Sequence, residues 1–257
     1  MGVINVTPDS FSDGGVHLRV EAAVTSAWGM FDAGAAIVDV GGESTRPGSR
    51  GVTAEEELAR IEPVLLDLTG APVSVDTSKA EVARRALELG VELINDVTAL
   101  RGDPELAGVI ADAGCYLCLM HMLGEPRTMQ DNPVYDDVVS DVKRFLTDRL
   151  EFAVTAGVRE ELVCLDPGIG FGKTVDHNLE LLRRLDELAA IGRPLLIGVS
   201  RKSSLGRILG DPEARTGTTA ASVGAAVSAY ERGASILRAH DVREHVEALT
   251  VASAVAG

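Results

Sequence analysis

ALELGVELINDVTALRGDPELAGVIADAGCYLCLMHM, residues 86–122, contains the pattern that decides the fold. A glycine, Gly90 or Gly114, precedes a short run rich in Val, Ile and Leu, at residues 92–95 and 115–120. Neither run alternates between apolar and polar residues, which is typical of parallel strands buried on both faces. Glycine also tolerates the left-handed conformation in which many helices end. The stretch therefore predicts two strands, each entered from the end of a helix.

The same pattern recurs along the whole chain. Short apolar runs occupy residues 2–6, 36–40, 72–75, 92–95, 115–120, 162–165, 195–199 and 235–239. Helical patterns lie between them, and one places apolar residues at three- and four-residue steps: Val139, Val142, Leu146, Leu150 and Ala153. Glycines stand shortly before seven of the runs: Gly34, Gly70, Gly90, Gly114, Gly157, Gly192 and Gly233. Eight βα units with right-handed crossovers predict a single (β/α)8 TIM barrel domain over residues 1–257. An open, doubly wound sheet is the alternative.

Length and composition suit this prediction. The chain has 257 residues, of which 46% are hydrophobic and 25% charged, and TIM barrels typically need about 250 residues. These values exclude a disordered tail, a collagen-like fibre and a coiled-coil rod. Apolar stretches such as residues 194–199 are too short to cross a bilayer, and no signal peptide pattern opens the sequence. We therefore expect a cytoplasmic protein.

The charge excludes two classes of partner. Lys and Arg number 24 against 39 Asp and Glu, which gives a net charge of −15. Such a surface repels nucleic acid and anionic membranes. An anionic ligand therefore requires Arg and Lys to gather at the site and reverse the local field.

The cysteines Cys115, Cys118 and Cys164 are odd in number, which indicates free thiols in a chain without a secretion signal. Cys115 and Cys118 form a CxxC pattern followed by His121, which is one arrangement for a metal site. We favour a buried strand, because residues three apart on a strand point to opposite faces and a closed zinc site needs four ligands.

Nearly every predicted strand ends on a polar residue, and active sites of TIM barrels lie at those ends. Helix capping is the simpler explanation for Asp96, Asp136 and Asp241, which precede helical patterns. Capping does not explain a set of Asn, Asp, Lys, Arg and His side chains that all face one mouth. The strand ends and the stretches after them hold Asn5, Asp76, Asn95, Met120, His121, Asp166, residues 200–203, Arg238 and His240.

Three familiar catalytic motifs are absent from the sequence. GIGFGKT, residues 168–174, has three residues between Gly168 and Gly172, whereas a P-loop needs four before its GK pair. GVSRK, residues 198–202, has Lys202 where a serine nucleophile elbow needs glycine. No HExxH occurs. The sequence therefore argues against a P-loop kinase, a serine hydrolase and a zinc hydrolase.

One group of strand-end residues suits a flat, amine-rich ring. Asp76, Asn95 and Asp166 offer acceptors and a carboxamide. Buried carboxylates need donors, and the edge of a pterin presents adjacent ring N–H and NH₂ groups. Lys202 can donate to an oxygen or nitrogen of the same ring.

A second group suits a diphosphate. Arg binds phosphate through two parallel hydrogen bonds, and Mg²⁺ prefers oxygen ligands, including those of phosphates. The group consists of Asn5, Thr45, Arg46, Arg238 and His240. The two groups together predict a site for a ring beside an anion.

Eight stretches taken together resemble the dihydropteroate synthase family. They are NVTPDSFSDGG at 5–15, GGESTRPGS at 41–49, VDTSK at 75–79, IND at 94–96, MHM at 120–122, DPGIGFGK at 166–173, SRKS at 200–203 and RAHD at 238–241. The match runs almost end to end and in order. The resemblance implies a transferase of folate biosynthesis that joins 4-aminobenzoate to (7,8-dihydropterin-6-yl)methyl diphosphate and releases diphosphate. It also implies a homodimer and a target of sulfonamides, which mimic aminobenzoate.

The resemblance assigns roles residue by residue. The implied pterin contacts are Asp76, Asn95, Met120, Asp166 and Lys202, of which Asp76, Asp166 and Lys202 are catalytic. The implied diphosphate contacts are Asn5, Thr45, Arg238 and His240, with Asn5 also the Mg²⁺ ligand. The implied aminobenzoate contacts are Phe11, Arg46, Pro47, Phe171 and Ser203.

The implied mechanism needs no covalent nucleophile. The carbon–oxygen bond to diphosphate breaks first, Asp76 and Asp166 stabilise the pterin cation, and Mg²⁺, Arg238 and His240 stabilise the leaving anion. The neutral arylamine then attacks. We expect the long first and second βα loops to be mobile without ligand and to exclude water when closed, with Phe11 over the amine.

One departure from the family pattern and two alternative functions remain. Family members usually carry a segment before the first strand, whereas this sequence opens within that strand, which puts the stability of the strand in question. A methyltetrahydrofolate-dependent methyltransferase has a pterin-binding barrel but lacks the long first and second loops. A non-catalytic pterin-binding paralogue is expected to have lost Asn5, Arg46 or Arg238, all of which are present.

Overall fold

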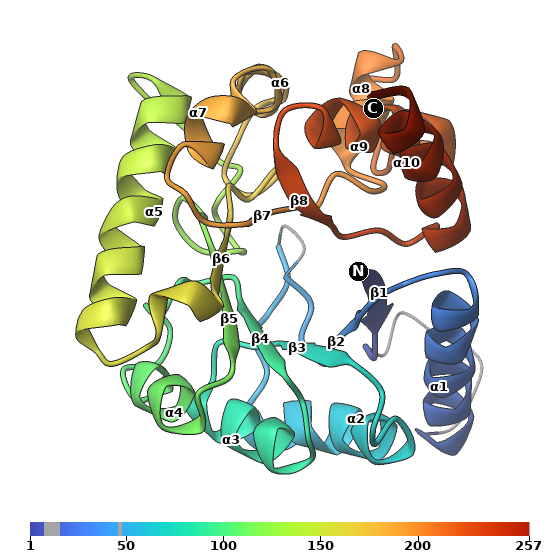
Figure 1. Cartoon of the computed structure of the whole chain (residues 1–257), viewed down its shortest axis with the longest axis vertical. Helices are drawn as coiled ribbons and strands as arrows, with labels where there is room; N and C mark the ends of the chain where they lie inside the picture. Colours follow the sequence, from blue (N-terminus) through green and yellow to red (C-terminus); the bar gives the residue numbers. More distant parts are fainter. Residues whose placement is uncertain (8–15, 46–47, 257) are drawn as a thin grey trace.

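The computed structural model describes residues 1–7, 16–45 and 48–256, and shows eight parallel strands in sequential order around a barrel (Figure 1). The strands are β1 (Gly2–Asn5), β2 (Val38–Gly41), β3 (Val73–Asp76), β4 (Leu93–Asp96), β5 (Tyr116–Met120), β6 (Val163–Asp166), β7 (Leu195–Ile197) and β8 (Ala234–Leu237). This confirms the predicted barrel, and the open-sheet alternative is wrong.

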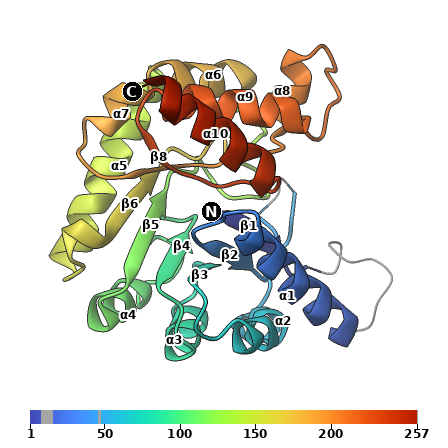
Figure 2. The ribbon, with the colours of Figure 1, turned by 45° about the vertical axis from the view of Figure 1, so that its right-hand side comes forward.

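Helices surround the strands on the outside (Figures 1 and 2). They are α1 (Val16–Asp32), α2 (Ala54–Asp67), α3 (Ala80–Glu88), α4 (Leu106–Ala113), α5 (Val138–Thr155), α6 (Val175–Arg183), α7 (Leu185–Ala189), α8 (Ser203–Ile208), α9 (Thr219–Tyr230) and α10 (Val242–Ala256), with a short 3₁₀ helix, η1 (Glu160–Leu162). None of the helices in the described part of the chain is long and apolar enough to span a membrane.

The seam between the last strand and the first closes the barrel. Gly2 bridges Ala239 in parallel fashion, and the Ala239 amide donates to the Met1 carbonyl oxygen at 2.9 Å. The terminal amino group of Met1 donates to the Leu237 carbonyl oxygen, also at 2.9 Å. The opening residues of the sequence therefore hydrogen-bond within the sheet.

The features used to predict the barrel are present in the structure. All seven joining glycines have positive φ, and Gly114, with φ of 62°, ends α4 in the left-handed conformation. The predicted stripe on α5 is buried at each of its five positions. The outward faces of the strands pack against such helix faces and form the main apolar core.

The inside of the barrel near the amino ends of the strands is apolar. Cys118 and Cys164 are neighbours in the β5–β6 register and are buried there as free thiols beside Leu93 and Leu196. Among the described residues no group of three or more His, Cys, Asp or Glu is placed to hold a metal.

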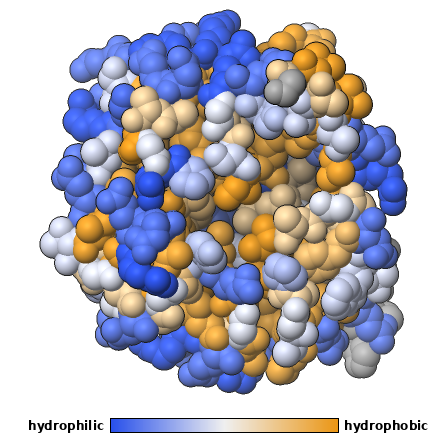
Figure 3. Space-filling view, viewed as in Figure 1, coloured by the Kyte–Doolittle hydropathy of each residue, from blue (hydrophilic) through white to orange (hydrophobic). Residues whose placement is uncertain are grey.

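A largely apolar cavity of about 490 Å³ lies at this amino end, lined by residues that include Met1, Ile37, Leu93, Tyr116 and His245. Figure 3 shows a central hollow, with apolar surface around it, on the face seen in that view. The polar residues predicted to act on a ligand lie instead at the carboxyl ends of the strands.

Candidate active site at the carboxyl ends of the strands

A buried aspartate on β2, Asp39, connects several strand ends. Its Oδ1 accepts a hydrogen bond from Ser74 Oγ at 2.7 Å. Its Oδ2 accepts from Asn95 Nδ2 at 3.0 Å and from Arg238 Nε at 2.7 Å. Arg238 Nη2 also donates to Asp76 Oδ2 at 3.4 Å. The contacts bring residues of β2, β3 and β4, and the residue after β8, into one polar cluster.

Two acceptor groups in this cluster can still receive hydrogen bonds. Asn95 Oδ1 is buried and has no hydrogen-bond partner, because the amide nitrogen is the atom that contacts Asp39. Burial, and then the nearby Asp39 charge, raise the pKa of Asp76 to about 8, although Arg238 opposes this. A ligand N–H donated to Asp76 favours the carboxylate and reverses such a shift. Both residues therefore fit a ligand edge that is rich in donors.

Asp166, at the end of β6, provides a third acceptor. Burial raises the pKa of its carboxyl, although the Gly168 amide donates to Oδ1 at 2.7 Å and lowers it. The carboxyl is 6% exposed, so an unmatched charge here is costly and a ligand donor is correspondingly favourable. The predicted pterin residues Asp76, Asn95 and Asp166 are thus polar groups of one mouth.

Lys202, the residue directly before α8, lies near these carboxyl groups. Its Nζ lies 4.2 Å from the centre of the Phe171 ring, a cation–π contact. Burial lowers the pKa of Lys202 to about 8, while Asp166 and Asp76 favour its charged form. Gly170 makes room for it, since a Cβ there would lie 3.1 Å from Lys202 Cδ. Lys202 and Phe171 are therefore held next to each other.

Lys173 fixes the loop between β6 and α6, a role that the sequence analysis did not find. Its buried Nζ contacts His121 Nδ1 at 2.8 Å and donates to the carbonyl oxygens of Gly168 and Phe171, each at 3.0 Å. Burial lowers the pKa of Lys173 to about 7 and that of His121 to about 2, so the imidazole is a neutral acceptor. This loop begins directly after Asp166 and contains Phe171.

His240 lies after β8 and contacts the end of the β7 segment. Ser200 Oγ is 3.1 Å from His240 Nδ1 and accepts from the His240 backbone amide at 3.1 Å. Arg201, with φ of 58°, forms two hydrogen bonds to the Asp241 carboxylate, at 2.5 and 3.0 Å. Burial and the positive charge of Arg238 lower the pKa of His240 to about 4. The imidazole is therefore neutral near pH 7.

Asn5 lies at the end of β1, the strand that pairs with β2. A Cβ on its neighbour Gly41 would lie 3.9 Å from Asn5 Oδ1 and 3.5 Å from Asp76 Cβ. The absent side chain leaves space between two oxygen-bearing residues. Met120 is buried at the end of β5, and Thr45 and Ser203 are half-buried. Phe11, Arg46 and Pro47 lie outside the described residues.

A charged network anchors the start of the second βα loop. Lys79 pairs with Glu43 of that loop, and its Nζ donates to Glu57 Oε2 at 2.6 Å. Arg60 Nη1 donates to the Gly42 carbonyl oxygen at 2.7 Å. Glu57 is fully buried on α2, and burial raises its pKa. The sequence analysis named none of these residues.

The structure contradicts the capping explanation for Asp96 and Asp136. The carboxylate of Asp96 accepts from the amides of Thr98 at 2.8 Å and Leu100 at 2.5 Å, so this residue serves the local turn. The prediction for Asp136 was wrong, because Asp137 caps α5 by accepting from the Ser140 amide. Asp241 precedes α10, but its carboxylate is bound by Arg201.

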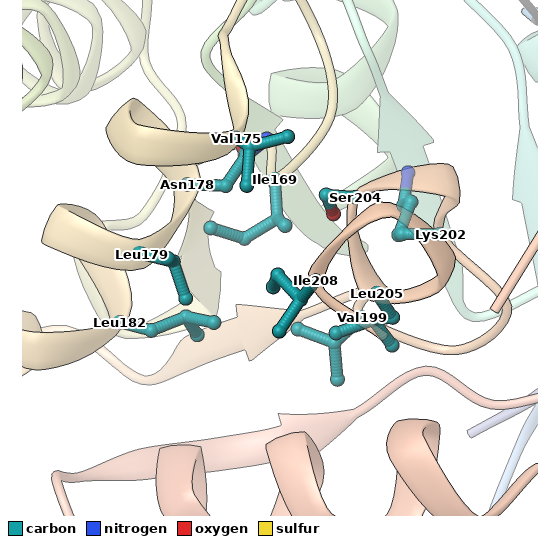
Figure 4. Close-up of a pocket in the computed structure, with 10 residues that line it drawn as sticks. All are labelled: Ile169, Val175, Asn178, Leu179, Leu182, Val199, Lys202, Ser204, Leu205 and Ile208. Atoms are coloured by element: carbon teal, nitrogen blue, oxygen red, sulfur yellow. The ribbon is translucent and has the colours of Figure 1, made fainter. Parts of the chain in front are cut away.

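A small apolar pocket lies between α6 and α8, with Lys202 at its edge (Figure 4). Its volume is about 10 Å³, roughly the space that one water requires. Ile169, Leu179, Leu205 and Ile208 are among its lining residues. The pocket is too small for a substrate, so the candidate site is the mouth itself.

Comparisons with known proteins agree with this geometry. Residues 1–240 match the family model described as "Pterin binding enzyme". A dihydropteroate synthase of Escherichia coli strain K12 is 47% identical over 259 residues, covering 99% of this chain and 90% of the relative. A Xanthomonas albilineans dihydropteroate synthase solved with 4-aminobenzoic acid superposes with a TM-score of 0.92 at 48% identity, covering 100% of this chain and 92% of that one. The same organism's enzyme in complex with 7,8-dihydropteroate gives 0.88 at 45% identity, with coverages of 100% and 93%.

Proposed function

The chain belongs to the dihydropteroate synthase family of pterin-binding enzymes, which are transferases, and we propose how its residues divide the reaction among themselves. The reaction joins 4-aminobenzoate to (7,8-dihydropterin-6-yl)methyl diphosphate and gives 7,8-dihydropteroate and diphosphate. The observation that carries the proposal is the unpartnered, buried Oδ1 of Asn95 on β4, a strand that lies between β3 with Asp76 and β6 with Asp166 in the order of the sheet.

The acceptor cluster binds the pterin ring. Asp76 and Asp166 accept from ring N–H and NH₂ groups, and Asn95 Oδ1 takes a further donor. Lys202 donates to the ring, and Met120 packs against it. Asp39 does not touch the ligand but orients Asn95 and Arg238 through its two hydrogen bonds.

The part of the mouth formed by the ends of β1 and β8 and by the loop after β2 binds diphosphate. Arg238 and His240 donate to phosphate oxygens, and Asn5 and Thr45 complete the set. The space beside Asn5 and Gly41 fits a Mg²⁺ ion held by one or two protein oxygens, because Mg²⁺ usually keeps few protein ligands where phosphates supply the rest. Asn5 would hold this ion, which neutralises phosphate charge when it is bound.

Catalysis then depends on charges already in place. As the carbon–oxygen bond breaks, Asp76 and Asp166 stabilise positive charge spread over the pterin, and Arg238 and His240 stabilise the leaving anion. The neutral amine of aminobenzoate attacks the same carbon. No residue has to become a covalent nucleophile.

We assign Phe171 and Ser203 to the binding of aminobenzoate. The ring of Phe171 contacts Lys202 Nζ, and Ser203 follows Lys202 in the sequence. Roles for Phe11, Arg46 and Pro47 stay predictions. We also propose a homodimer, because apolar side chains are exposed at the end of α8 and just after it, and on α10: Ile208, Leu209, Val251 and Val255. Sedimentation equilibrium tests this assembly, and a monomer at micromolar concentration contradicts it.

Calorimetry with two probes tests the division of the mouth. Asp166→Asn should weaken a pterin that lacks phosphate and leave inorganic diphosphate unchanged, whereas His240→Ala should do the reverse. Arg238 is unsuitable for this comparison because it contacts Asp39 and Asp76 as well. Equal losses of both probes in each variant contradict the division. A non-catalytic paralogue would bind both probes without turnover.

A further inference from the structure

We propose that Ser200 is a positioning residue that selects the tautomer of His240 in which Nε2 carries the hydrogen donated to diphosphate. The inference rests on the proposed diphosphate role of His240. It begins with the Ser200 hydroxyl, which is 5% exposed and lies 3.1 Å from both the backbone nitrogen and Nδ1 of His240.

The hydrogen bonds at Ser200 determine which ring nitrogen accepts. The His240 backbone N–H donates to Ser200 Oγ, so Oγ is an acceptor there. A serine hydroxyl has one hydrogen to donate. Within the described chain, His240 Nδ1 is the other partner of this hydroxyl and can receive that hydrogen. The opposite assignment leaves a buried hydroxyl hydrogen without an acceptor, which is costly.

A neutral imidazole carries its single hydrogen on the other nitrogen when Nδ1 accepts. Burial and the cations Arg238, Arg201 and Lys202 oppose protonation of His240, while Asp241 favours it, and the balance leaves the pKa at about 4. The ring is therefore neutral near pH 7 and has Nε2–H. The hydrogen bonds that the described residues form with His240 involve its Nδ1 and its backbone amide, so Nε2–H can be donated to a ligand.

The backbone supports the same arrangement. Ser200 follows β7 and His240 follows β8, and these strands pair directly. The bidentate contact between Arg201 and Asp241 joins the next residues of the two segments. The Arg201 amide also donates to Ser222 Oγ at 2.9 Å. Ser200 is therefore held in register with His240.

The first experiment measures the tautomer directly. Proton–nitrogen correlation spectra of the ¹⁵N-histidine protein, with His240 assigned from His240→Ala, should show Nε2 protonated and Nδ1 unprotonated near pH 7. Ser200→Ala should give a mixture of tautomers, and Ser200→Thr, which keeps the hydroxyl, should restore the original signal. A protonated Nδ1 in the parent protein overturns the proposal.

The second experiment is titration with inorganic diphosphate. Ser200→Ala should lower the affinity about three- to tenfold, the worth of one hydrogen bond, and leave a phosphate-free pterin unaffected. Ser204→Ala, a buried serine nearby, is the matched control and should bind diphosphate as the parent does. In a His240→Ala background, Ser200→Ala should cause no further loss.

The outcomes distinguish this proposal from the proposed function. A further loss in the His240→Ala background means that Ser200 acts on the fold and overturns the proposal alone. If Nε2 is protonated but His240→Ala leaves diphosphate affinity unchanged, the diphosphate assignment of His240 fails, and the role of Ser200 fails with it.

Discussion

Replacing Asp39 by Asn tests whether one buried carboxylate organises the mouth. The change preserves volume but removes the charge and turns one acceptor into a donor. Asp39 is 0% exposed and receives hydrogen bonds from Ser74 at 2.7 Å, Asn95 at 3.0 Å and Arg238 at 2.7 Å. Removing one partner of a buried ion pair costs about 3–5 kcal/mol, because the remaining charge stays buried. We expect a loss in that range.

Ser74→Ala is the matched control, since it removes one neutral donor from the same carboxylate and should cost about 1 kcal/mol. Urea denaturation gives both free energies of unfolding, and calorimetry gives the affinity for a phosphate-free pterin. Asp39→Asn should weaken that affinity because Asn95 loses its orientation. Adding Arg238→Met should recover part of the stability by removing a cation that keeps only its longer contact to Asp76, at 3.4 Å. If Asp39→Asn is no less stable than Ser74→Ala, the proposed hub is wrong.

Three further predictions concern the β6–α6 loop and Lys202. Gly168→Ala should abolish pterin binding in calorimetry, because its Cβ would lie 1.9 Å from the His121 carbonyl oxygen, whereas Gly108→Ala, with nothing within 4 Å, should bind normally. The lowered pKa of Lys173, about 7, means that only the unfolded chain binds this proton from about pH 8 to 9.5, so stability rises with pH. In Lys173→Met the slope of the unfolding free energy against pH should therefore be smaller than in the parent by about 1.4 kcal/mol per pH unit. Equal slopes in the variant and the parent contradict the burial of Lys173. The value of kcat/KM should fall above about pH 8 as Lys202 loses its proton, and Lys202→Arg, which stays charged, should move that limb upward; an unchanged limb refutes the assignment.

The fold could be predicted from the sequence because the glycines that separate each helix from the next strand are local sequence features. The seven joining glycines all have the positive φ that the pattern indicated, and the bounds of the strands lie within two residues of their predicted bounds. The placement of Asp76, Asn95 and Asp166 followed from a general property of barrels, in which strand ends share one mouth.

Residues within strands and loops were harder to find. Asp39 lies inside the apolar run of residues 36–40. A lone charge in a strand that is buried on both faces requires partners, and this was the signal that could have identified it. No role was predicted for Lys173, although a lysine after a glycine-rich turn can donate to the carbonyl oxygens of that turn. The contact between Ser200 and His240, 40 residues apart, depends on side-chain geometry that the strand order alone does not give.

Diphosphate release measured with and without 4-aminobenzoate tests the central claim most directly. The chain is supplied with (7,8-dihydropterin-6-yl)methyl diphosphate and Mg²⁺, and diphosphate and 7,8-dihydropteroate are quantified together. The mouth described above predicts rapid release only when aminobenzoate is present, with one diphosphate for each dihydropteroate, and strong loss of both in Asp166→Asn. Tight binding of the pterin substrate without aminobenzoate-dependent release would contradict it and indicate a pterin-binding protein without synthase activity.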